Sequence, residues 1–138
     1  MDKKLFERYF DGVVRYWKIT KLANDNVKIG NLAADEMIYF LIVLINEGGI
    51  GLLKKRILVL DDRKLQQRLL ISLTPFDLDF AKSTYKKYLD EKVHEYIENQ
   101  PLAWNNFVDD IYLKSSRDLI DKVALKKKIK IDFNYPNS

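Results

Sequence analysis

The chain of 138 residues contains no cysteine and only one histidine, His94. The lack of thiols excludes a disulfide framework, a zinc–thiolate site and a cysteine nucleophile. Acid–base or metal chemistry at a histidine would have to use His94, whose spacing of four residues from Asp90 and from Glu98 puts three polar groups on one helical face. A solvated charged face has the same spacing. We therefore expect no metal, no cofactor and no catalytic residue.

Reaction-specific motifs are also missing. The glycine-rich stretch Gly48-Gly49-Ile50-Gly51 does not match either glycine pattern of nucleotide-binding loops, so a turn between two helices is the better interpretation. No serine lies in a G-x-S-x-G elbow. Asp62 and Lys64 have the D-x-K spacing of metal-dependent nucleases and follow a segment that could be a strand. A nuclease site there remains the least favoured alternative.

Long apolar stretches are scarce, and the main one runs over nine residues from Met37 to Ile45. A membrane-spanning helix needs about 20 apolar residues, so this run predicts a core helix and no membrane partner. Asn31 as a cap and Gly48 as a terminator place the helix at about 32–46. The N-terminus has no secretory signal, and together with the absent cysteines this predicts a cytoplasmic protein.

Apolar residues recur at helical spacing on both sides of this central helix. Leu5 to Trp17 carries one such stripe, and Thr74-Pro75 predicts the start of a long helix over about 75–99. Another helix should follow Ser115-Ser116. The fold class is therefore mainly α, a single-domain helical bundle over residues 1–138 around the buried central helix.

A small two-stranded β element is compatible with the pattern as well. Residues 129–133 alternate apolar and polar side chains, which is typical of a strand. Their partner would be residues 56–60, a stretch whose pattern fits a helix or a strand. The connector from Val27 to Ile29 is expected to be extended.

The net charge of +4 is spread thinly along the chain. A dedicated nucleic-acid binder usually has a basic stripe, whereas this chain has only two modest clusters. They consist of Lys54, Lys55 and Arg56, and of Lys126, Lys127, Lys128 and Lys130. A small nucleic-acid-associated protein therefore remains an alternative.

With few routes to catalysis, a non-enzymatic binding role becomes the leading hypothesis. Such a protein needs a rigid core and exposed aromatic anchors, for which Trp17, Trp104 and Tyr112 are candidates. No sequence feature indicates an oligomeric state.

The general character of the chain, with its Met1-Asp2-Lys3-Lys4 start and the helix of about 32–46, resembles the immunity proteins of bacterial contact-dependent growth inhibition systems. The resemblance implies a protein partner, a cognate toxin domain that is often a nuclease. Acidic side chains would then meet a basic enzyme. The candidates are Asp61, Asp62, Asp109 and Asp110.

Overall fold

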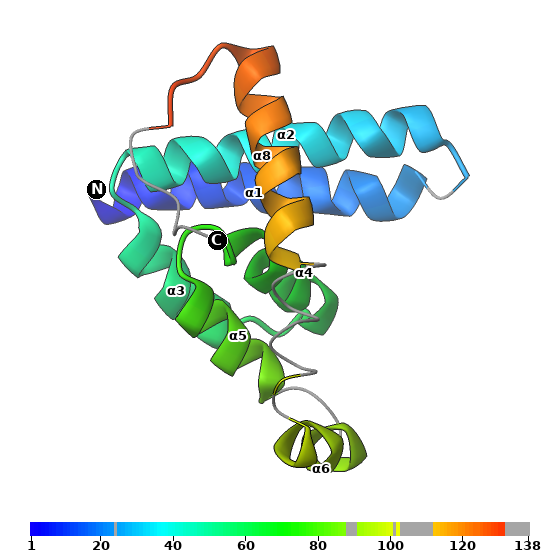
Figure 1. Cartoon of the computed structure of the whole chain (residues 1–138). Helices are drawn as coiled ribbons and strands as arrows, with labels where there is room; N and C mark the ends of the chain where they lie inside the picture. The colour runs from blue at the N-terminus through cyan, green and yellow to red at the C-terminus, as the bar shows by residue number, and fades with distance from the viewer. Residues whose placement is uncertain (24, 88–90, 101, 103–111, 132–138) are drawn as a thin grey trace. The chain divides into compact units, whose positions relative to one another are not determined.

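The computed structural model describes residues 1–23, 25–87, 91–100, 102 and 112–131, apart from the side chain of Tyr96. These residues form helices and no strand, which confirms the mainly α prediction (Figure 1). The helices are α1 (Lys3–Ala23), α2 (Val27–Asn46), α3 (Ile50–Leu58), α4 (Arg63–Leu73), α5 (Leu78–Lys86), α6 (Glu91–Asn99) and α8 (Lys114–Lys127).

The described residues divide into two compact units. One unit consists of residues 1–59 and 120–131, and the other of residues 60–119. Helix α8 contributes its first turns to the second unit and its remainder to the first. The expectation of one domain over the whole chain stays a prediction.

Helix α1 follows the predicted stripe. Phe6, Phe10 and Val13 are buried along one face, and the rings of Phe6 and Phe10 stack with centroids 5.6 Å apart. Asp2 caps the helix by accepting a hydrogen bond from the backbone N–H of Leu5 at 2.8 Å. The periodic apolar side chains define this helix as the sequence indicated, and Asp2 caps its N-terminal end.

Helix α2 is the expected central helix, but it begins five residues earlier. Asn26, and not Asn31, caps it by accepting a hydrogen bond from the N–H of Ile29 at 3.1 Å. The prediction of an extended connector over residues 27–29 is wrong. The Asn26 side chain satisfies an N–H of the first turn, and this cap lets the helix start before the apolar run.

The part of α2 from Ala33 to Ile45 lies in the core of its unit. Its buried apolar residues are Ala33, Met37, Ile38, Leu41, Ile42, Leu44 and Ile45. With 20 residues, α2 is also long and apolar enough to cross a membrane by length and composition, and 44% of its apolar window is buried in the structure. The apolar run from Met37 to Ile45 is shorter than the helix that contains it, so the length of the run does not by itself exclude a membrane-spanning helix. The burial of side chains from Ala33 to Ile45, and not the length of the helix, supports their place in the core.

The close approach of α1 and α2 depends on a small residue. A Cβ atom placed on Gly12 would lie 2.8 Å from the ring of Phe40. That ring is held by three others, with centroid distances of 6.4 Å to Tyr9, 5.8 Å to Tyr16 and 5.6 Å to Tyr39. Because the ring is surrounded, it has little room to move away from a larger residue.

The turn after α2 agrees with its glycine-rich sequence. Gly48 adopts a positive φ of 82°, a conformation that favours glycine. The N–H of Gly49 donates to the carbonyl of Leu44 at 2.9 Å, which closes the end of α2. This is the helix-to-helix turn expected in place of a nucleotide-binding loop.

The suggested β element is not formed by the described residues. Arg56 to Leu58 belong to α3, where Leu53 and Ile57 are buried four residues apart on one helical face. Helical periodicity thus outweighs the β-branched content of this stretch. Residues 129–131 are neither helix nor strand, and the Nδ2 of Asn46 donates to the carbonyl of Lys130 at 2.8 Å. Residues 132 and 133 lie outside the described residues.

The second unit contains α4, α5 and α6. Asp62 caps α4 by accepting from the N–H of Leu65 at 3.1 Å. The single helix expected over 75–99 is wrong in two respects. The first helix in this stretch, α5, begins at Leu78 and not at Pro75. Asp77 caps it by accepting a hydrogen bond from the N–H of Phe80, whereas the Thr74 hydroxyl donates to the carbonyl of Ile71 in the last turn of α4. Helix α5 also ends at Lys86, before α6 begins at Glu91.

Replacement of Gly12 by alanine tests the α1–α2 packing. Overpacking against Phe40 costs about 1–3 kcal/mol, whereas the better helix propensity of alanine returns about 1 kcal/mol. We expect a loss of about 1–2 kcal/mol in the free energy of unfolding, measured by urea denaturation. Gly51→Ala is the matched control, since no atom lies within 4 Å of its added Cβ, and it should not destabilise the chain. Equal stability of both variants would contradict the packing described here.

Candidate partner-binding surface

The acidic pair Asp61-Asp62 lies at the start of α4. The Asp62 carboxylate accepts a hydrogen bond from the N–H of Leu65 and thereby caps α4. The Asp61 side chain is exposed. The segment before them is helix α3 and not the strand that a carboxylate nuclease would need. Among the described residues, no three side chains of the metal-binding types gather in one place. The D-x-K spacing of Asp62 and Lys64 therefore lacks its expected structural context.

Three further candidates, Trp104, Asp109 and Asp110, lie outside the described residues, and their role stays a prediction. Tyr112 is described. It lies in a π-helical turn with Leu113, directly before α8. Its side chain is half-buried in the second unit.

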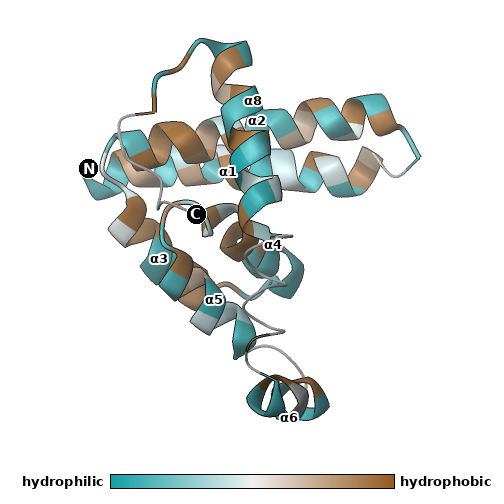
Figure 2. Cartoon of the chain, viewed as in Figure 1, coloured by the Kyte–Doolittle hydropathy of each residue, from teal (hydrophilic) through white to brown (hydrophobic). Residues whose placement is uncertain are grey.

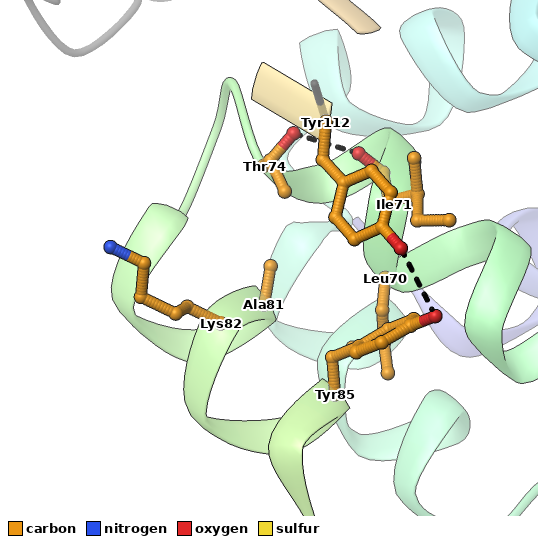
Figure 3. Close-up of a pocket in the computed structure, with 7 residues that line it drawn as sticks. All are labelled: Leu70, Ile71, Thr74, Ala81, Lys82, Tyr85 and Tyr112. Atoms are coloured by element: carbon orange, nitrogen blue, oxygen red, sulfur yellow. Dashed lines mark hydrogen bonds between the residues drawn. The ribbon is translucent and has the colours of Figure 1, made fainter. Parts of the chain in front are cut away.

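Tyr112 lines a shallow depression between α4, α5 and the start of α8 (Figure 3). The depression encloses about 180 Å³, part of it open to solvent, and its wall is almost wholly apolar. No water-sized sphere fits inside it. Its lining residues are Leu70, Ile71, Thr74, Ala81, Lys82, Tyr85 and Tyr112.

The two tyrosines of the depression contact each other. Their hydroxyl groups are 3.3 Å apart, and their ring centroids are 5.5 Å apart with the planes tilted by 57°. Figure 3 shows both hydroxyls turned toward one another, while the Lys82 side chain extends away from them. The pair thus presents aromatic surface together with polar tips.

Neighbouring hydrogen bonds hold the end of α4 beside the start of α8. The buried Ser116 of α8 donates its hydroxyl to the carbonyl of Ile71 at 2.7 Å. The Thr74 hydroxyl donates to the same carbonyl at 2.8 Å. Ile71 therefore joins the end of α4 to the first turns of α8, beside which Tyr112 lies.

Burial raises the pKa of Tyr112 above its ordinary value of 10.0, and the hydrogen bond with Tyr85 raises it further. Both causes act in the same direction, because burial removes hydration from the phenolate and the hydrogen bond with Tyr85 favours the protonated phenol. The phenol therefore stays protonated at a pH at which an exposed tyrosine has already ionised.

The basic clusters proposed for nucleic acid are partly engaged within the first unit. Arg56 pairs with Glu7 and lies 5.3 Å from the ring of Phe6. Lys126 pairs with the buried Asp35 at 3.2 Å, and Lys127 pairs with Glu36. The bond to Glu36 is the main cause that raises the pKa of Lys127. Three of the seven cationic residues therefore hold helices together.

Tyr85 was not singled out by the sequence as a site residue, because its spacing fitted an apolar helical stripe. It lies 27 residues from Tyr112, and no local pattern connects the two. Only the packing of α5 beside α4 brings Tyr85 to the depression.

Comparisons of the chain with protein families, curated proteins and solved structures find no match.

A pH titration of near-ultraviolet absorbance tests the environment of Tyr112. We expect the difference between wild type and Tyr112→Phe to show no phenolate signal near pH 10, since the pKa of Tyr112 is raised. Tyr85→Phe should shift the Tyr112 titration downward but leave it above the ordinary value, because burial is the larger cause. Circular dichroism would confirm that each variant stays helical. A Tyr112 signal with an ordinary midpoint would contradict the buried, hydrogen-bonded pair.

Proposed function

We propose that the chain is a non-enzymatic binding protein of the immunity or antitoxin kind, and that its partner protein docks over the Tyr85–Tyr112 depression. The observation that carries this proposal is the hydroxyl–hydroxyl contact of the two half-buried tyrosines at an apolar surface. Tyrosine is enriched among the residues that dominate protein–protein binding energy. The bacterial cytoplasm is the compartment that this role implies.

The shape of the depression favours a macromolecule over a small molecule. Small ligands bind in cavities of roughly 300–1,000 Å³ that enclose most of their surface. The depression here has no enclosed space large enough for even a water molecule. A protein surface can cover such a shallow apolar area and exclude solvent from around the aromatic rings.

Fixed side chains also favour tight binding. The rings of Tyr85 and Tyr112 contact one another, and Tyr112 precedes the helix that Ser116 joins to Ile71. Ordering a mobile side chain at an interface costs about 0.5–1.5 kcal/mol, so side chains already held in place lose less on binding. The tyrosine pair is therefore a suitable anchor for a partner.

Charge supplies a second element of the proposal. Asp61 is exposed at the start of α4 in the same unit. An exposed carboxylate at an interface rim raises the association rate with a basic partner, such as a nuclease toxin domain. Asp62 has a structural role at the helix cap and is not needed as a contact.

Growth rescue and complex formation test the proposal directly. The product of the open reading frame immediately upstream, the candidate toxin domain, would be produced alone and together with this chain. We expect the chain to restore growth and to elute with the toxin domain as a complex. Tyr112→Ala should weaken the complex by at least about tenfold, the loss typical of a binding hot spot.

Two controls distinguish lost binding from lost folding. Leu125→Ala changes an aliphatic residue that is 82% exposed in the first unit and should leave rescue unchanged. Circular dichroism of Tyr112→Ala should show an unchanged helix content. The proposal is wrong if no neighbouring product inhibits growth, or if Tyr112→Ala and wild type bind the toxin domain equally.

A further inference from the structure

The free end of the α1–α2 hairpin carries an exposed surface that the tyrosine depression does not explain. We define this hairpin tip as residues 17–23 and 25–32. The buried residues of α1 lie before Val14, and those of α2 begin at Ala33. None of the described residues from 14 to 32 is buried. The two helices therefore extend beyond the core that holds their other halves.

Large aliphatic side chains lie exposed on this tip. Leu22 is 81% exposed, Val27 69%, Leu32 51% and Ile29 48%. They come from both helices and from both sides of the turn. In Figure 2 the end of the hairpin mixes apolar and polar residues. Four exposed large aliphatic residues within one short segment make the tip a candidate interaction surface.

The hairpin tip carries more positive than negative charge, which favours a negatively charged partner. Lys18, Lys21 and Lys28 stand against the single acid Asp25. Lys21 lies 5.9 Å from the centre of the Trp17 ring, one helical turn away. Exposed aliphatic residues, flanking lysines and a nearby tryptophan are the combination by which peripheral elements enter the interface of an anionic bilayer.

We propose that the hairpin tip docks on an anionic membrane surface, with its aliphatic side chains in the interfacial layer and its lysines on the lipid headgroups. A second copy of the chain fits this surface less well, because two tips with an excess of lysine would repel each other. The docking is peripheral. The part of α2 from Ala33 to Ile45 stays in the fold, where Asp35 and Glu36 pair with Lys126 and Lys127.

Vesicle co-sedimentation of the full chain tests this docking. We expect the chain to bind phosphatidylcholine vesicles that contain phosphatidylserine and not vesicles of phosphatidylcholine alone. High salt should release the protein, since it screens the attraction of the lysines to the headgroups. The interaction should be independent of any protein partner at Tyr85 and Tyr112.

Paired variants separate the apolar and the charged contributions. Leu22→Gln/Val27→Gln should lower the apparent affinity for anionic vesicles by at least about tenfold, because both side chains lose their apolar contact with the interface. Lys18→Glu/Lys28→Glu should lower it by at least about tenfold as well, through charge reversal. Leu125→Gln and Lys122→Glu are controls on exposed positions of α8 and should keep the affinity within about twofold.

The changed positions are all exposed, so circular dichroism and the thermal midpoint should stay the same in every variant. The proposal is overturned if anionic vesicles do not bind, if the tip and α8 variants bind equally, or if high salt leaves binding intact. It is also overturned if light scattering shows a dimer that Leu22→Gln/Val27→Gln abolishes while vesicles bind no protein. That result would assign the tip to a second copy of the chain.

Discussion

The contact between Gly12 and the ring of Phe40 is the constraint on which the first unit depends. Because Gly12 has no side chain, the Phe40 ring of α2 can lie close to the backbone of α1. The rings of Tyr9, Tyr16 and Tyr39 contact Phe40 as well. The buried residues of α2 run from Ala33 to Ile45 and include the helical turns on either side of Phe40. Ion pairs from the end of α8 to Asp35 and Glu36 then hold a third helix on α2. Apolar packing provides the larger stabilisation, and the pairs compensate for acids near the core.

The sequence predicted the helices whose apolar spacing is regular. The stripe from Leu5 to Trp17 predicted α1, whose buried face holds Phe6, Phe10 and Val13. The predictions from sequence were less accurate where two local signals competed. Asn31 looked like the cap of α2, but Asn26 lies earlier and already satisfies the first turn. The β-branched content around Ile57 suggested a strand, although Leu53 and Ile57 share one buried helical face.

The candidate site could be anticipated only in part. Tyr112 was chosen as an aromatic anchor, and it does line a surface depression. Its partner Tyr85 could not be recognised, because an aromatic residue within a helical stripe has the same pattern whether it fills the core or edges a surface. The intramolecular contacts of the lysine clusters could not be predicted for a related reason. Sequence gives the charge of Lys126 and Arg56 but not the acids that helix packing brings to them.

The two ends of helix α2 lie in different environments. In α2, residues 33–45 are core and residues 27–32 form an exposed tip. Hydrogen–deuterium exchange measured along α2 tests this division most directly, since amide protection follows local stability. We predict slow exchange from Met37 to Ile45 and fast exchange from Val27 to Leu32. Equal protection along the whole helix would contradict the division between core and tip.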